Sequence, residues 1–210
     1  MATFMAKWST KHPGQSGHIH LSLQNEEKQN IFFDSSKRLN MSDEMRWFIG
    51  GQQKLMHEFI AMVAPTINSY RRLIPNYWAP IDNSWGVDNR TASLRVITGT
   101  PTSQRVEYRL ASADSNPYLA MSVALGSGLW GIENKIEPTK SISEAAEKRG
   151  IKPLPSSLGD ASTRLRKSKV ARLLFGSEFI EHFCTTREKE EELHRNQVDE
   201  WQLERYFEII

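Results

Sequence analysis

The sequence contains one cysteine, very little net charge and no long uninterrupted apolar stretch. With only Cys184 available, no disulfide can form within the chain, and a cysteine-rich zinc site is excluded. Lys and Arg number 27 against 25 Asp and Glu, a net charge of +2, which excludes the broad basic surface typical of nucleic-acid-binding proteins. Serine and glycine interrupt the longest apolar stretch, residues 119–132, and no secretion signal opens the chain. We therefore expect a cytoplasmic protein with no nucleic-acid or membrane partner.

Short apolar and alternating segments predict a sheet. The chain has 210 residues, of which 39% are hydrophobic and 25% charged, and this composition suits one globular domain. Strands are predicted at Met1–Lys7, Gly17–Leu23, Ala92–Ile97 and Arg105–Leu110, and the last two form a hairpin across the turn TGTPTS.

Helical signals predict two long helices, near 42–64 and 116–136, and a mainly helical region after Pro138. Ser42 and Asn116 are their capping residues, and the second helix is apolar on most sides, which is typical of a buried helix. Further helices are expected at 141–150, 163–175 and 177–196, whereas prolines favour a loop over 65–85. The fold class is α+β: a curved, mainly antiparallel sheet with the two long helices packed behind it.

Two strands carry polar side chains at alternate positions. His18, His20 and Ser22 share one face of the first, where two imidazoles could meet a metal or a nucleotide phosphate, although a lone histidine is more often structural. In RVEYR, period two places Arg105, Glu107 and Arg109 on one face. Either this face is exposed to solvent and its charges pair with one another, or Glu107 is a ligand for a hard cation and the two arginines beside it bind anionic oxygens.

Further arginines lie in the middle of the chain. Arg71, Arg72, Arg90 and Arg95 occur in aromatic-rich loops and at a strand, where guanidiniums commonly hold carboxylate or phosphate, although surface arginines are also common. The three clusters together contain too few carboxylates for a two-metal site.

Five motifs in order resemble the C-terminal half of the glutamine synthetase catalytic domain. They are GQSGHIHLSL, NSYRRLIPNYWAP, SWGVDNRTASLRV, RVEYRLASADSNPYLA and GIENKIEP. The resemblance covers residues 1–138, with WQLERYFEI as a weaker match near the end. It implies an ATP-dependent ligase that joins the γ-carboxylate of glutamate to ammonia or an amine through a γ-glutamyl phosphate.

The same resemblance assigns roles to individual residues. It implies that His18 and Glu107 bind Mg²⁺ or Mn²⁺, and that Arg90 and Arg109 are catalytic. The implied ATP-binding residues are His20, Ser22, Arg90, Arg95 and Arg105. The implied glutamate-binding residues are Gly14, Arg72, Arg90 and Arg109.

Two positions depart from the family pattern. The loop GQSGH lacks the asparagine that contacts glutamate, and Trp78 stands where ammonia-using members have a glutamate that accepts the ammonium proton. An indole cannot take a proton, but it can pack against an alkyl chain or face a cation, so the substitution favours a bulkier amine. The motifs YWAP and SWGVDNRT likewise resemble γ-glutamyl-polyamine and γ-glutamylamine ligases. The alternative is that Trp78 fills the core of an inactive paralogue.

The resemblance also implies a single, N-terminally incomplete catalytic domain, with a site-bearing region at 1–138 and a mainly helical region at 139–210. The acidic strands of the family belong upstream of the motifs, so we expect this chain alone to be inactive. Family members form homo-oligomeric rings, whereas the state of this chain is left open. The alternative function is a non-catalytic scaffold or interaction protein that resembles glutamine synthetase.

Overall fold

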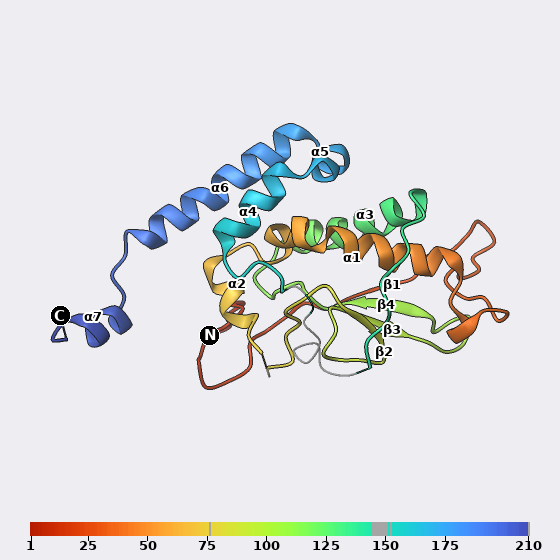
Figure 1. Ribbon diagram of the computed structural model, residues 1–210, viewed down its shortest axis with the longest axis horizontal. Coiled ribbons are helices and arrows are strands. Elements are labelled where there is room, and N and C mark those ends of the chain that lie inside the picture. The colour runs from red at the N-terminus through yellow and green to blue at the C-terminus, as the bar shows by residue number, and fades with distance from the viewer. Residues whose placement is uncertain (76, 144–150, 152, 210) are drawn as a thin grey trace.

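The computed structural model describes residues 1–75, 77–143, 151 and 153–209, and it confirms the α+β class. Four short strands form one sheet in the order β1-β4-β3-β2 (Figure 1). They are β1 (Ile19–Leu21), β2 (Trp85–Val87), β3 (Leu94–Ile97) and β4 (Arg105–Tyr108). β4 lies antiparallel to both β1 and β3, as the hairpin prediction required, whereas β2 lies parallel to β3. The sheet is therefore mixed, and strands of three or four residues are too short to give it the expected curl.

The helices follow the capping signals closely. They are η1 (Arg38–Asn40), α1 (Asp43–Val63), α2 (Ile67–Arg72), α3 (Pro117–Glu133), α4 (Leu158–Lys167), α5 (Lys169–Phe175), α6 (Ser177–Arg195) and α7 (Glu200–Tyr206). The Ser42 hydroxyl accepts a hydrogen bond from the Met45 amide at the start of α1, and the Asn116 side chain caps α3 ahead of Pro117. None of the helices in the described part of the chain is both long enough and apolar enough to cross a membrane.

Helices α1 and α3 pack against each other on one side of the sheet (Figure 1). They approach closely because both carry glycine at the crossing. A Cβ at Gly51 would collide with the backbone of Ser127 and Gly131. Apolar residues from α1 and the sheet, such as Phe48 and Leu94, fill the space beneath and form one continuous core.

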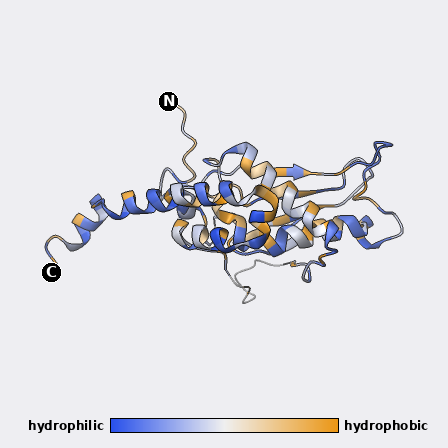
Figure 2. Cartoon of the chain, turned by 90° about the horizontal axis from the view of Figure 1, so that it is seen from above, coloured by the Kyte–Doolittle hydropathy of each residue, from blue (hydrophilic) through white to orange (hydrophobic). Residues whose placement is uncertain are grey.

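The last part of the chain is helical, as predicted. α4 packs against α6, where Arg166 donates to Glu188 at 2.8 Å. α6 then extends away from the sheet, and α7 lies at the end of this arm (Figure 1). Hydrophilic residues cover most of the arm, whereas apolar residues gather in the body of the molecule (Figure 2).

Several local predictions were wrong. Met1–Lys7 is not a strand. Its backbone accepts hydrogen bonds from Gln15 of the following loop, whose amide donates to the Ala6 carbonyl and whose side chain donates to the Met5 carbonyl. The helix predicted at 163–175 is two helices, because Ser168 ends α4 and caps α5. The proline-rich segment 65–85 contains the short helix α2, which a capping box at Thr66 stabilises. Most of the helix predicted at 141–150 lies outside the described residues.

Candidate active site

A cavity of about 450 Å³ brings together eight of the residues predicted to form the site. They come from the loop before β1, from α2 and the loop after it, and from β3, β4 and their flanking turns. These eight are Gly14, His18, Arg72, Trp78, Arg90, Arg95, Glu107 and Arg109. Segments that are up to 95 positions apart in the sequence therefore line one space. The predicted convergence of His18 and Glu107 is confirmed.

Glu107 lines this cavity and contacts three other site residues. Its Oε1 atom accepts a hydrogen bond from Arg109 Nη1 at 2.6 Å and lies 2.8 Å from His18 Nδ1. Its Oε2 atom accepts from Arg95 Nη1 at 3.1 Å. The Glu107 side chain is only 3% exposed. Strand register explains the geometry, because His20 and Arg95 are the direct cross-strand partners of Glu107 on either side.

The surroundings keep Glu107 ionised. Burial by itself would raise the pKa of Glu107, but the charge of Arg109 and the hydrogen bond from Arg95 outweigh burial and lower it. The carboxylate is therefore negative at neutral pH. It is the charge that holds Arg95 and Arg109 in place.

His18 is held in a defined orientation. Burial and the nearby charge of Arg109 lower the pKa of His18, although Glu107 opposes them, so the imidazole is neutral at pH 7. Nδ1 faces the Glu107 carboxylate, while Nε2 lies 2.9 Å from the Ser16 hydroxyl. With the proton on Nδ1, this atom donates to Glu107 and Nε2 accepts from Ser16, while Arg109 Nη1 lies farther from Nδ1, at 3.5 Å.

Positive charge exceeds negative charge in the cavity. The guanidiniums of Arg72, Arg90, Arg95 and Arg109 line it together with one carboxylate, that of Glu107. Arg72 is almost fully buried, donates to the Leu110 carbonyl, and has a pKa lowered by burial to about 10. It is therefore charged at pH 7. A surplus of guanidinium groups in a recess suits a carboxylate or phosphate ligand.

The implied divalent cation fits between His18 and Glu107. The 2.8 Å between Nδ1 and Oε1 is close to the spacing of two adjacent ligands that each lie about 2.1 Å from an ion. An ion there would displace the Nδ1 proton. However, the described residues contain no group of three His, Cys, Asp or Glu side chains that could enclose a metal. Because Arg95 and Arg109 also compete for Glu107, we expect Mg²⁺ or Mn²⁺ to bind weakly to this chain.

Three of the predicted ATP-binding residues lie outside the cavity. Arg105 Nε donates to His20 Nδ1 at 3.1 Å, and Arg105 also donates to the Ser103 carbonyl. Ser22 is exposed just beyond the end of β1. His20 shares the sheet face of Glu107 because the two are cross-strand partners. The predicted site therefore has two parts: the cavity, and a neighbouring group of His20, Ser22 and Arg105 along β1 and β4, which we call the sheet margin.

Sequence reasoning missed residues that orient the predicted ones. Ser16 hydrogen-bonds to His18, and Asp88 accepts from Arg95 at 3.0 Å. Lys7 is buried, donates to the His12 carbonyl at 2.6 Å and lies 4.2 Å from the centre of the Tyr77 ring. Lys7 therefore joins the loop before β1 to the loop that carries Trp78. Only the aromatic content of that second loop could have indicated such a contact.

Comparison with known proteins agrees with this geometry. Residues 1–206 match the family model described as glutamine synthetase, catalytic domain. The whole chain is 43% identical to type-1 glutamine synthetase 2 of Dictyostelium discoideum and covers 41% of it. The whole chain is also 40% identical to glutamate–isopropylamine ligase of Pseudomonas sp and covers 46% of it. The chain is also 38% identical to the glutamine synthetase of Thermotoga maritima, in an alignment that includes 98% of this chain and 48% of that protein.

Solved structures show the same relationship. The structure titled "GmaS/ADP complex-Conformation 1" superposes with a TM-score of 0.88 at 28% identity, over 98% of this chain and 49% of that one. The ligand-free form, titled "Apo GmaS without ligand", gives a TM-score of 0.84 at 29% identity, over 98% of this chain and 48% of that one. This chain therefore spans about half the length of the proteins it matches.

Proposed function

The chain belongs to the glutamine synthetase family, and from this premise we propose that it forms part of the active site of an ATP-dependent ligase. The ligase joins the γ-carboxylate of glutamate to ammonia or, by preference, to an alkyl amine or polyamine. The observation that carries the proposal is the cavity in which Glu107, Arg95 and Arg109 meet beside the indole of Trp78.

The arginines suit both steps of this reaction. In the first step, a γ-carboxylate oxygen of glutamate attacks the terminal phosphorus of ATP, which yields γ-glutamyl phosphate and ADP. In the second, the amine nitrogen bonds to the carbonyl carbon of the γ-glutamyl phosphate, phosphate leaves from that carbon and the nitrogen loses a proton. Arg72, Arg90 and Arg109 bind glutamate and neutralise charge on its transferring phosphate, while Arg95 contacts the phosphates of ATP. A divalent cation held by His18 and Glu107 would add to that neutralisation.

The sheet margin is the proposed nucleotide site. His20 and Arg105 already form a hydrogen bond there, and Ser22 lies beyond them on the exposed side. An imidazole, a guanidinium and a hydroxyl supply donors for ribose and phosphate oxygens. Because Glu107 pairs directly with His20, nucleotide bound at the margin would lie next to the arginines of the cavity.

Trp78 supports an amine larger than ammonia. Its side chain is 76% exposed, so the alternative that it fills the core is wrong for this chain. Its backbone φ of 54° lies in the left-handed region, which is unusual for a bulky residue and costs about 1–3 kcal/mol. Such strain is typical of functional sites. Because Trp78 cannot accept a proton, its contribution is apolar contact or a cation–π interaction with the amine.

Amine preference is tested in a chimaera in which this chain replaces the matched part of Thermotoga maritima glutamine synthetase. Coupled ADP release is measured with ammonium, ethylamine and putrescine. We expect Trp78→Glu to reduce the kcat/KM ratio of ethylamine to ammonium by roughly tenfold or more, the value of one or two apolar methylene contacts. Trp201→Glu, an equally drastic change at the exposed helix α7, is the control. A chimaera that strongly prefers ammonium before mutation refutes the amine assignment.

The second candidate function is a non-catalytic relative with a scaffold role. It is favoured by the lack of a three-ligand metal group among the described residues. Failure of the chimaera to bind ATP with Mg²⁺ would support it. The chain by itself is expected to be inactive, and amine-dependent ADP release from the purified chain contradicts that expectation. Ring assembly and cytoplasmic location are predictions that follow from the family.

A further inference from the structure

Lys7 is a buried cation at the border of the candidate active site. The residue is 7% exposed, its ammonium donates to the His12 carbonyl at 2.6 Å, and the same group lies 4.2 Å from the centre of the Tyr77 ring. Within the described part of the chain, no carboxylate forms an ion pair with it. Lysine is rarely buried unless its charge is paired, so the carbonyl and the aromatic ring are the groups that hold it here.

The backbone of Lys7 is fixed to helix α2. The Lys7 amide donates to Asn68 Oδ1 at 2.7 Å, and Asn68 Nδ2 donates to the Lys7 carbonyl at 2.8 Å. Asn68 lies about one turn before Arg72, which lines the cavity of the candidate active site. The Lys7 side chain therefore starts from a fixed point on the helix that carries a site arginine.

The Lys7 ammonium joins two loops that line this cavity. His12 directly precedes Pro13 in the loop before β1, and Tyr77 directly precedes Trp78 in the loop after α2. Pro13, Tyr77 and Trp78 all line the cavity. Among the described residues of the two loops, 8–17 and 73–79, no hydrogen bond runs directly from one loop to the other. The lysine is therefore the polar link between them.

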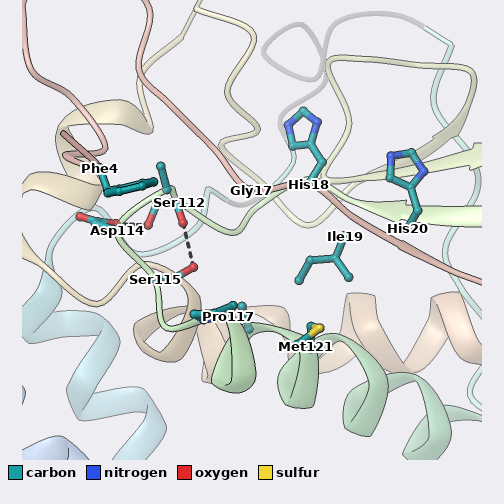
Figure 3. A pocket seen from close by; sticks show the side chains of 12 residues that line it. Phe4, Gly17, His18, Ile19, His20, Ser112, Asp114, Ser115, Pro117 and Met121 are labelled. Carbon is teal, nitrogen blue, oxygen red and sulfur yellow. Dashed lines mark hydrogen bonds between the residues drawn. The ribbon is translucent and has the colours of Figure 1, made fainter. Parts of the chain in front are cut away.

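The N-terminal segment also borders a second cavity, of about 710 Å³. Phe4 lines it, and Ile19 points into it towards Met121, whereas His18 points to the other side of β1 (Figure 3). The prediction of a buried helix holds for only one side of α3, because the side near this cavity exposes Tyr118, Met121, Leu125 and Leu129. Lys7 and the two groups that it contacts do not line this cavity. A change at Lys7 therefore acts on the candidate active site.

The position of Trp78 depends on this link. Its side chain is 76% exposed, so packing restrains it little, and its φ of 54° lies in the left-handed region. A bulky residue keeps such a backbone conformation only where its surroundings enforce it. Tyr77, the residue directly before it, is held by the Lys7 ammonium. The cation–π contact therefore restrains the backbone that carries the indole.

We infer that Lys7 is a positioning residue for amine preference. Acting through Tyr77, it holds the indole of Trp78 at the edge of the cavity, at a fixed separation from the loop that contains Pro13. This inference rests on the proposed function and deepens it, because it places one determinant of amine preference outside the cavity. Lys7 itself does not touch the substrate.

Fluorine NMR of the chain labelled with fluorotryptophan tests the position of the indole. The chain has six tryptophans, and Trp78→Phe identifies the Trp78 signal by its loss. Lys7→Met removes the charge and keeps an unbranched side chain, so it should shift the Trp78 signal, whereas Lys7→Arg should leave it in place. Lys11→Met makes the same change at an exposed lysine of the neighbouring loop and is the control.

A second variant keeps this measurement decisive. Tyr77→Leu removes the ring but not the lysine, and it should move the Trp78 signal as Lys7→Met does. Circular dichroism shows whether each variant is folded. A Trp78 signal that stays unchanged in folded Lys7→Met or in folded Tyr77→Leu overturns the inference.

Amine preference is measured by coupled ADP release in the chimaera with Thermotoga maritima glutamine synthetase. Lys7→Met should lower the kcat/KM ratio of ethylamine to ammonium roughly threefold, the value of one cation–π contact near the surface, and Lys7→Arg should restore the ratio. The KM of ATP should stay the same. Because Lys7 acts through Tyr77, adding Tyr77→Leu to Lys7→Met should lower the ratio no further. Equal losses with ethylamine and ammonium would indicate general loosening and contradict the inference.

The inference and the proposed function fail in different ways. If the unmodified chimaera releases no ADP with any amine, the proposed function fails, and a Trp78 signal that still moves in Lys7→Met supports the link between the loops. If the chimaera prefers ethylamine and Lys7→Met leaves that preference unchanged, the proposed function stands and the inference is overturned.

Discussion

Replacement of Glu107 by glutamine tests the charge arrangement of the candidate active site. The change preserves side-chain size and removes one negative charge. In the folded protein, Arg109, whose side chain is 6% exposed, then has no carboxylate partner. Its guanidinium still donates to the Arg90 carbonyl and lies 3.5 Å from His18 Nδ1. Breaking a buried ion pair by removing one partner costs about 3–5 kcal/mol.

The lower end of that range applies here. Arg95, the other partner of Glu107, is 20% exposed and keeps its contact with Asp88 at 3.0 Å. We therefore expect Glu107→Gln to lower the free energy of unfolding by about 3 kcal/mol, which corresponds to a melting temperature lower by about 6–12 °C in a chain of this size. Urea unfolding followed by circular dichroism, with chelator present, measures the change.

Two variants serve as references for this measurement. Asp88→Asn removes a carboxylate whose side chain is 60% exposed, and it should cost less than about 1 kcal/mol. The double variant Glu107→Gln, Arg109→Met removes both charges and should recover most of the loss. If Glu107→Gln is as stable as the unmodified chain, Glu107 does not hold the arginines, and the account of the site is wrong.

The difference between the unmodified chain and Glu107→Gln should also depend on pH. Because the folded state lowers the pKa of Glu107, its ionised form contributes stability. That contribution is complete above the pKa of an unfolded glutamate, about 4.3, and declines as pH falls towards the lower folded value. A difference that grows on acidification contradicts the assigned direction.

Two further predictions concern packing. Gly51→Ala places a methyl group against the backbone of α3 and should lower the free energy of unfolding by roughly 1–3 kcal/mol. Gly126→Ala, where no neighbouring atom would lie closer than 3.8 Å to the new methyl group, should raise it by up to about 1 kcal/mol. Urea unfolding compares the two variants, and equal effects would exclude a tight crossing of α1 and α3. Burial raises the pKa of the fully buried Cys184, so alkylation of its thiol by iodoacetamide at pH 7 should occur only as fast as the chain unfolds, and rapid labelling of the folded protein contradicts this.

Local sequence patterns predicted much of the secondary structure and the orientation of the site residues. Period two in RVEYR places Glu107 and Arg109 on the same side of β4, and capping residues such as Ser42 and Asn116 mark the starts of the long helices. These features depend on neighbours within a few positions along the chain. Sequence motifs therefore indicate them, and the same motifs indicate the glutamine synthetase family, which the match over residues 1–206 confirms.

Only the tertiary structure decided which distant residues meet. Strand register pairs His20 with Glu107 and so brings His18, two positions earlier on the same face, within 2.8 Å of the Glu107 carboxylate, although 89 positions separate His18 and Glu107 in the sequence. The exposure of Trp78 and the uncovered side of α3 are likewise set by what packs nearby. The sequence shows that a residue is apolar, but it does not show whether that residue is buried or exposed. Which of the two occurs depends on long-range packing, which local periodicity does not encode.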